Sequence, residues 1–245
     1  MPPLLLLPGM LCDAASWRAQ MENLADIAEP RVMAYGDADS FTAMADAVLA
    51  DAPERFALAG HSMGGRVAQE VYRMAPDRVI ALALLATDYR GHADDASRAA
   101  ESARRDNMIA KVRADGMEAF ARAWAPQVIA SANMEDAALV GEVVAMMTRH
   151  SLAALEAETL AGLSRPDRSA LLSRISCPTL ICSGDQDTLR PISVHQDMAV
   201  RIPNSHLVVI EGSGHMVAME RPAAVSKALH DWLSFGAGQR GAAGS

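Results

Sequence analysis

The sequence predicts an α/β protein built around a mostly parallel, doubly wound sheet. Short apolar runs recur along the chain, and segments with helical spacing separate them. The runs are continuously apolar rather than alternating, which is typical of strands covered by helices on both faces. Hydrophobic residues make up 51% of the 245 residues and aromatic residues only 4%, so we expect an aliphatic core. The repeated β-α-β-α order is the pattern of an open sheet with helices on both sides.

The expected elements follow this pattern along the chain. The strands are predicted at the apolar runs Leu4–Leu7, Val32–Tyr35, Phe56–Ala59, Val79–Ala86, Thr179–Ser183 and Leu207–Ile210. Helices are predicted at Phe41–Ala50, Met63–Ala75, Pro191–Ile202 and Pro222–Phe235. The last two begin with a proline, which suits a first helical turn because the N–H at that position has no partner within the helix.

Residues 90–165 interrupt the alternation, because they contain no convincing strand and look helical almost throughout. We expect them to form a helical lid inserted into a core made of residues 1–89 and 166–236. Most apolar residues of the lid are expected to pack helix against helix, and a minority to face a substrate pocket. Residues 237–245, with their Gly and Ala, are expected to form a disordered tail.

Charge and cysteine content exclude several functions. The formal net charge of -8 argues against nucleic acid as a partner, because phosphate binding needs clustered cations. The three cysteines, Cys12, Cys177 and Cys182, indicate neither a disulfide framework nor a zinc site, and they fit a cytoplasmic location. The N-terminal leucine run lacks the basic region of a signal peptide, and no apolar run approaches the roughly 18 residues of a membrane helix. We therefore expect no metal and no membrane partner.

The candidate nucleophile is Ser62. The segment Gly60-His61-Ser62-Met63-Gly64 satisfies the pattern G-x-S-x-G, in which glycines leave room for a strained turn from strand to helix. The pattern alone is weakly informative, but here a predicted strand leads into it and a predicted helix follows. This context is the one that lifts a serine hydroxyl to the edge of a sheet.

A serine hydroxyl needs a histidine to accept its proton and a carboxylate to orient that histidine. His215 lies between glycines in the loop after the last predicted strand, so we expect it to be the base. Asp187 is the preferred acid because it lies deepest in the loop after the strand Thr179–Ser183. Asp185 in the same loop and Asp88 after an earlier strand stay open as alternatives.

Two backbone N–H groups are needed to bind the oxyanion of the transition state. One is expected from Met63, next to the nucleophile, and the other from Met10, in the turn after the first strand. Gly9 allows the backbone of this turn to approach a substrate closely, and Gly60 and Gly64 support the turn at the serine.

With these sites assigned, the chain resembles the lid-bearing α/β-hydrolases, the branch that holds enol-lactonases, carboxylesterases and cofactor-free haloperoxidases. The resemblance rests on four segments, which are LLLLPGMLCDAASW, LAGHSMGG, PTLICSGDQDTLRP and LVVIEGSGHMVAMERP. They look like that family's oxyanion turn, nucleophile elbow, acid loop and histidine loop. The resemblance implies Ser62, Asp187 and His215 as the triad, with Met10 and Met63 as oxyanion donors.

The chain departs from the family in two places. Many relatives have His-Gly where this chain has Pro8-Gly9, so a substrate contact from that histidine is not expected. The chain also starts at the strand before the oxyanion turn, without the N-terminal hairpin common in the family, so we expect about six parallel strands. A serine nucleophile argues against the haloalkane dehalogenase and epoxide hydrolase branches. The lid segment RRDNMIAKVRADGMEAFARAW is most similar to the enol-lactonases.

The expected function is hydrolysis of a small carboxylic ester or lactone through an acyl-enzyme, without a cofactor. Three alternatives stay open: hydrolysis of an activated C–C bond, perhydrolase activity, and a ligand-binding or receptor-like role on a hydrolase scaffold. Substrate identity and oligomeric state stay undetermined. Four arginines of the predicted lid could attract a substrate carboxylate or, with their acidic neighbours, form only a solvated helix face; they are Arg98, Arg104, Arg105 and Arg113.

Overall fold

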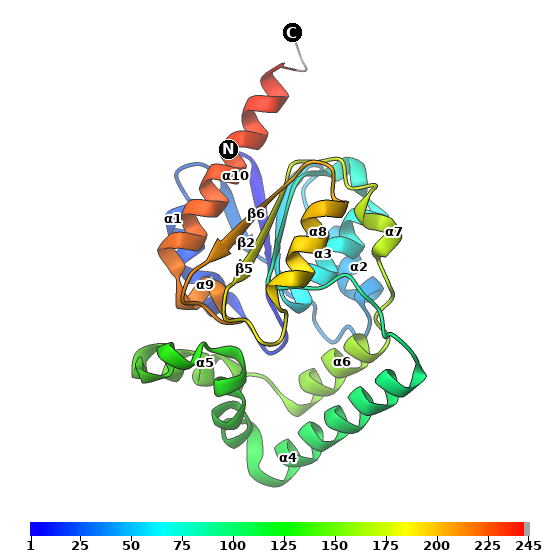
Figure 1. The fold of residues 1–245 in the computed structure, drawn as a ribbon, viewed down its shortest axis with the longest axis vertical. Coiled ribbons are helices and arrows are strands. Elements are labelled where there is room, and N and C mark those ends of the chain that lie inside the picture. The colour runs from blue at the N-terminus through cyan, green and yellow to red at the C-terminus, as the bar shows by residue number, and fades with distance from the viewer. Residues whose placement is uncertain (243–245) are drawn as a thin grey trace.

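The strands form one sheet in which every neighbouring pair is parallel, in the order β2-β1-β3-β4-β5-β6. The computed structural model describes the backbone of residues 1–242 and the side chains of residues 1–234. The predicted parallel α/β sheet is thereby confirmed (Figure 1). The strands are β1 (Pro3–Leu7), β2 (Glu29–Val32), β3 (Phe56–His61), β4 (Val79–Leu85), β5 (Thr179–Gly184) and β6 (Ser205–Ile210).

The second strand lies earlier than predicted. It was expected at Val32–Tyr35, but β2 ends at Val32 because Glu29 to Val32 pair with Pro3 to Leu6 of β1. The apolar residues that suggested a strand, Met33 and Tyr35, come after it and are buried in the core on one face of the sheet. As an edge strand, β2 is half exposed, so its own residues carry little apolar signal.

Helices cover both faces of the sheet, with α2, α3 and α8 on one side and α1 and α10 on the other (Figure 1). The residues of β1 show why its sequence is continuously apolar. Leu5 and Leu7 belong to the core on one face, and Leu4 and Leu6 belong to the core on the other. The helices of this part are α1 (Arg18–Asn23), α2 (Phe41–Asp51), α3 (Met63–Met74), α7 (Ser169–Leu172), α8 (Ile192–Arg201), α9 (Val217–Glu220) and α10 (Pro222–Ala242), with the short 3-10 helices η1 (Ala14–Trp17) and η2 (Pro76–Arg78).

A helical insertion between β4 and α7 lies beyond one end of the sheet (Figure 1). It consists of α4 (Asp95–Val128), the 3-10 helix η3 (Ser131–Glu135), α5 (Ala137–Thr148) and α6 (Leu152–Leu163). Helix α4 is kinked at Gly116, whose φ of 85° is open to glycine but not to most other residues. The insertion has an apolar core of its own, which also takes in Leu11 and Met216 from the sheet-bearing part.

The end of the chain differs from the prediction. Residues 237–242 were expected in a disordered tail, but they continue α10, which ends at Ala242. A glycine within a helix costs only about 1 kcal/mol relative to alanine, so the glycines here need not end one. Residues 243–245 lie outside the described residues.

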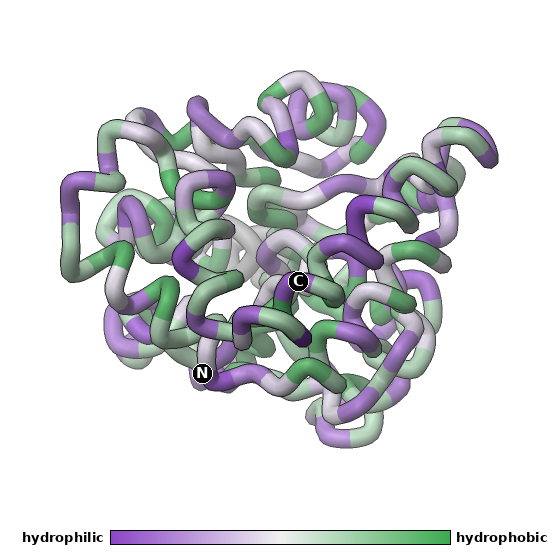
Figure 2. The backbone as a smooth tube through the Cα atoms, turned by 90° about the horizontal axis from the view of Figure 1, so that it is seen from below, coloured by the Kyte–Doolittle hydropathy of each residue, from purple (hydrophilic) through white to green (hydrophobic). Residues whose placement is uncertain are grey.

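Polar and apolar stretches alternate along the outer coils of the chain (Figure 2). Among the described residues, no single helix is both long and apolar enough to cross a membrane. Only α5 and α6 taken together, with a 91° bend between them, reach that length and composition.

Candidate active site

Ser62 lies in the sharp turn between β3 and α3, with φ 52° and ψ -114°. A positive φ is unusual for a residue with a side chain, and such strain is kept where the surrounding structure enforces it. Here close backbone packing enforces it. A Cβ atom on Gly64 would lie 2.2 Å from the carbonyl oxygen of Leu7, and one on Gly60 would lie 2.3 Å from the carbonyl oxygen of Gly64. The glycines of the motif therefore hold the start of α3 against the end of β1.

Ser62, His215 and Asp187 form one hydrogen-bonded chain. The Oγ atom of Ser62 lies 2.8 Å from Nε2 of His215, and Nδ1 of His215 lies 2.8 Å from Oδ2 of Asp187. The side chain of Asp187 is fully buried. Burial alone would raise its pKa, but the neighbouring His215 and the N–H groups of Leu189 and Arg190 hold that pKa below its usual value. The carboxylate thus stays ionised beside the imidazole.

The two other candidate acids are engaged elsewhere. Asp185 accepts a hydrogen bond from the N–H of Ser213 at 3.1 Å. Asp88 is paired with the guanidinium of Arg90 at 2.8 Å. Burial opposes the ionisation of Asp88, but hydrogen bonds from Arg90 and the charge of Arg66 lower its pKa to about 2. Of the three candidate acids, Asp187 is the one whose carboxylate lies within hydrogen-bond distance of His215.

The turn after β1 lies against the serine. A Cβ atom on Gly9 would be 3.3 Å from Cβ of Ser62 and 2.9 Å from Nδ1 of His61, so only glycine leaves this approach open. The N–H of Met63 is at the first position of α3, where a helix offers no partner. Within the described residues, neither Met10 nor Met63 donates its N–H to another group. Both N–H groups are therefore available to a substrate oxygen.

Two buried histidines that the sequence analysis did not single out, His61 and His195, support the site. His61 donates from Nε2 to the carbonyl of His215 at 2.8 Å, because a carbonyl can only accept. His195 accepts the N–H of Thr87 at 3.1 Å, and the hydroxyl of Thr87 donates to the carbonyl of Ser62 at 2.6 Å. His61 stands inside the serine motif, which was a usable signal, whereas His195 lies within α8 and carried none.

Glu220 fixes the histidine loop to the helical insertion. Its buried carboxylate accepts the N–H of Gly214 at 3.0 Å, the N–H of Ala130 at 2.9 Å and the side-chain amide of Asn133 at 2.7 Å. The N–H groups of His215 and Met216 both donate to the carbonyl of Val128, at 2.9 and 3.0 Å. The position of His215 is thus set partly by residues of the insertion.

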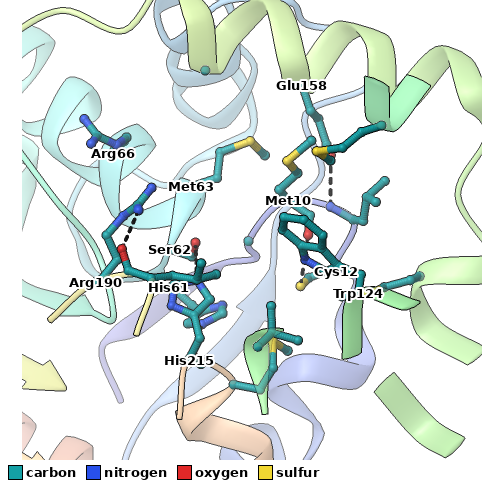
Figure 3. A pocket seen from close by; sticks show the side chains of 18 of the residues that line it. Met10, Cys12, His61, Ser62, Met63, Arg66, Trp124, Glu158, Arg190 and His215 are labelled. Carbon is teal, nitrogen blue, oxygen red and sulfur yellow. Dashed lines mark hydrogen bonds between the residues drawn. The ribbon is translucent and has the colours of Figure 1, made fainter. Parts of the chain in front are cut away.

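A cavity of about 100 Å³ opens above Ser62. One side is apolar and includes Trp124, whose ring stacks on Phe120 at a centroid distance of 5.7 Å. Arg66 and Arg190 lie on the other side of Ser62 in Figure 3. Among the residues that the structure describes, no three His, Cys, Asp or Glu side chains converge so as to hold a metal ion.

The cationic side carries more guanidinium than carboxylate charge. Glu101 pairs with Arg165 at 2.8 Å and with Arg105 at 3.4 Å. The guanidinium of Arg66 is 3.8 Å from the carboxylate of Asp88, which is a long ion-pair distance. Burial, together with the nearby charge of Arg190, lowers the pKa of Arg66 to about 9. Within the part of the chain described, the guanidinium of Arg190 has no carboxylate partner and donates to the carbonyl of Leu189 at 2.7 Å.

Of the four arginines named from the sequence, two line a cavity and two do not. Arg105 lines the cavity above Ser62, and Arg104 lines an adjoining outer cavity. Arg98 lines neither of these cavities, and Arg113 forms an exposed pair with Glu156. Sequence reasoning missed Arg66, Arg165 and Arg190, because only the fold brings the residues after Ser62 and Asp187 to the end of the insertion.

The sheet and the hydrogen-bonded residues at its edge together define a class of protein. A parallel sheet, a serine on a strained strand-to-helix turn, and a hydrogen-bonded histidine and aspartate on later loops are what an α/β-hydrolase requires. The chain belongs to the alpha/beta hydrolase family, whose model matches residues 4–228. The family resemblance inferred from the four sequence segments is therefore confirmed.

The relatives include ester hydrolases. The chain is 29% identical over 239 residues to a pimeloyl-[acyl-carrier protein] methyl ester esterase of Aliivibrio salmonicida (strain LFI1238), covering 94% of this chain and 91% of the relative. A thermophilic esterase from Thermogutta terrifontis has a similar structure, with a TM-score of 0.85, 29% identity, and coverage of 96% of this chain and 90% of that one. The enol-lactonase from Burkholderia xenovorans LB400 shares the fold, with a TM-score of 0.83, 20% identity, and coverage of 96% and 94%.

Proposed function

We propose that the protein is a serine hydrolase that cleaves small carboxylic esters or lactones through an acyl-enzyme. Ser62 Oγ attacks the carbonyl carbon, and His215 Nε2 takes the hydroxyl proton. The N–H groups of Met10 and Met63 bind the oxyanion, and the alcohol leaves with the proton from His215. Water, deprotonated by the same histidine, then releases the acid. The hydrogen-bonded chain from Ser62 through His215 to Asp187 carries this proposal.

The proposal is tested with Ser62→Ala. We expect it to lower kcat for a p-nitrophenyl acyl ester by several orders of magnitude, on the order of 10⁴-fold or more, because the nucleophile is lost. Ser173→Ala, a change at an exposed serine after α7, is the matched control and should retain activity. Turnover of S62A near the wild-type rate would refute the assignment.

The alternatives from the sequence are separated in the same experiment. Product analysis distinguishes ester hydrolysis from C–C cleavage and from peracid formation. A receptor-like protein would be labelled at Ser62 by a fluorophosphonate but would turn over no member of a panel of esters, lactones and thioesters. If the wild-type protein turns over at least one member of the panel and S62A does not, the receptor-like hypothesis is contradicted.

We further propose that the substrate carries an anionic group, such as a second carboxylate. The surplus of guanidinium groups over carboxylates beside Ser62 supports this. Among the described residues the guanidinium of Arg190 has no carboxylate partner, and burial of the Arg66 guanidinium near it is costly without an anion. The guanidinium groups that line the cavity come from both the insertion and the core, and of the four arginines named from the sequence they include only Arg105; they belong to Arg66, Arg105, Arg165 and Arg190.

The test compares the monomethyl and dimethyl esters of one dicarboxylic acid. Arg190→Gln should raise KM for the monomethyl ester about tenfold, since a charge-assisted hydrogen bond is worth about 1.5–3 kcal/mol. The KM for the neutral dimethyl ester should change less than about twofold. Arg113→Gln, at an exposed arginine outside both cavities, should change neither value. Equal effects of R190Q on the two esters would remove the anionic group from the proposal.

A further inference from the structure

Glu158 connects the helical insertion to the turn after β1. Its carboxylate Oε2, on α6, accepts the N–H of Leu11 at 2.9 Å, although 147 positions separate the two residues. In the described part of the chain, no other hydrogen-bond donor reaches this carboxylate. The contact is drawn in Figure 3, where Glu158 points down from the insertion beside Met10.

The turn that receives this contact has an unfavourable residue at its third position. The carbonyl of Gly9 accepts the N–H of Cys12 at 3.1 Å, which makes residues 9–12 a β-turn. Leu11 has φ 54°, and Met10 is not among the residues with positive φ, so the turn is of type II. Type II turns place glycine or asparagine at this position, and a left-handed leucine costs about 1–2 kcal/mol.

The type of turn is decided by the peptide between Met10 and Leu11. Type I and type II turns differ by a flip of this central peptide, and type I would return Leu11 to a favourable negative φ. Two contacts hold the peptide in the less favourable state. Glu158 accepts its N–H, and the Sγ–H of Cys12 lies 3.4 Å from its carbonyl oxygen. After a flip, this carbonyl oxygen would point toward the Glu158 carboxylate.

We propose that Glu158 is a positioning residue for the oxyanion turn: it keeps the Met10–Leu11 peptide in the type II orientation and so fixes Met10. The inference rests on the proposed function, because it needs Met10 N–H as an oxyanion donor. The side chain of Met10 is also restrained from the insertion, since Nη1 of Arg105 lies 3.1 Å from its Sδ. The insertion therefore shapes the catalytic turn as well as covering it.

Burial of the Glu158 carboxylate is unfavourable, and this supports a specific role for it. Burial raises the pKa of Glu158 to about 7, and only the Leu11 N–H and the charge of Arg105 act to lower it. Tyr35 and Cys12 face the same region; burial raises both their pKa values, so both stay uncharged and offer no compensating charge. An apolar residue at position 158 would avoid the unfavourable burial of a carboxylate, but it would leave the N–H of Leu11 without an acceptor.

The first test compares two replacements of Glu158. Glu158→Met fills similar space without an acceptor, and we expect it to lower kcat about tenfold or more with KM within about twofold, because a misplaced oxyanion donor weakens only the transition state. Glu158→Gln keeps an oxygen acceptor and should recover most of this loss. Glu156→Met, two positions away on the same helix, is the control for changes in α6. A folded E158M enzyme with wild-type kcat would overturn the proposal.

The second test asks whether the turn type is the cause. Leu11→Gly makes the type II turn favourable without help, so E158M should reduce kcat less than about twofold in the L11G background. Leu11→Asn serves the same purpose if L11G loses its folded state, as judged by circular dichroism. The same loss of kcat from E158M in both backgrounds would contradict the peptide-flip account. S62A separates the two proposals, because retained turnover in S62A removes the proposed function itself.

Discussion

His61 and His195 stand close to the Ser62–His215 pair, and both are buried. Burial lowers the pKa of each to about 4, with the neighbouring His215 adding to the effect on His61. Both rings are therefore neutral near pH 7, and His195 needs the neutral form because its Nε2 accepts the N–H of Thr87. His215 is thus the histidine placed to exchange a proton with the serine.

The raised pKa of Glu158 predicts a dependence of stability on pH. Its value of about 7 in the folded protein lies above the ordinary 4.5 expected of the unfolded chain. The folded state keeps this proton where the unfolded chain has lost it, so the contribution of Glu158 to the free energy of unfolding decreases as the pH rises through this range.

Glu158→Gln removes the titration. We expect the Tm of E158Q, relative to wild type, to increase as the pH is raised from about 5 to about 8, measured by thermal denaturation. Glu156→Gln is the control, and its Tm should stay parallel to wild type. Parallel curves for E158Q would show that the carboxylate is already ionised below pH 5.

Single residues of the site were predictable where their position on a loop determined their role. Ser62, His215 and Asp187 each follow a strand that the apolar runs predict, and the carboxyl ends of parallel strands meet at one edge of the sheet. Glu158 could not be found this way. It lies in the middle of a helix with ordinary helical spacing, and only the packing of α6 over the turn after β1 gives it a partner.

At the scale of elements, the histidine loop depends on the insertion. Glu220 at the end of α9 binds three N–H donors, and two of them belong to the segment after α4. The loop and the insertion should therefore lose stability together when this carboxylate is removed.

Glu220→Ala leaves those three buried donors without their acceptor. We expect a loss of about 3 kcal/mol or more in the free energy of unfolding, since each unpaired buried group costs about 1–3 kcal/mol. Urea denaturation measures it, with Glu135→Ala, at an exposed position of η3, as the control. A loss below about 1 kcal/mol would mean that water replaces the carboxylate.

The elements themselves were predictable to different degrees. The inner strands β1, β3, β4 and β5 are apolar on both faces, and their positions agree with the apolar runs to within a residue or two. The edge strand β2 is half exposed and was placed about three residues too late. The helices of the insertion could be predicted as helical, but the kink at Gly116 and the packing of α6 depend on contacts between distant residues.

For the molecule as a whole, the order of strands explains where the site lies. From β1 the chain passes to β2 on one side and then to β3 on the other, so the loops after β1 and β3 separate at the carboxyl end of the sheet. Ligands of open α/β sheets bind at such a point. Gly9 and Ser62 stand at these two loops, and the insertion covers them from beyond the sheet (Figure 1).

The placement of the three tryptophans gives the molecule an optical reporter of its own. Trp17 and Trp232 are buried in the core on one face of the sheet, away from the cavity lining, whereas Trp124 lines the cavity above Ser62. A substrate bound there would change the surroundings of the Trp124 indole and leave those of Trp17 and Trp232 unchanged. Occupancy of the site can therefore be followed by intrinsic fluorescence in S62A, with no label attached and no turnover to complicate the signal.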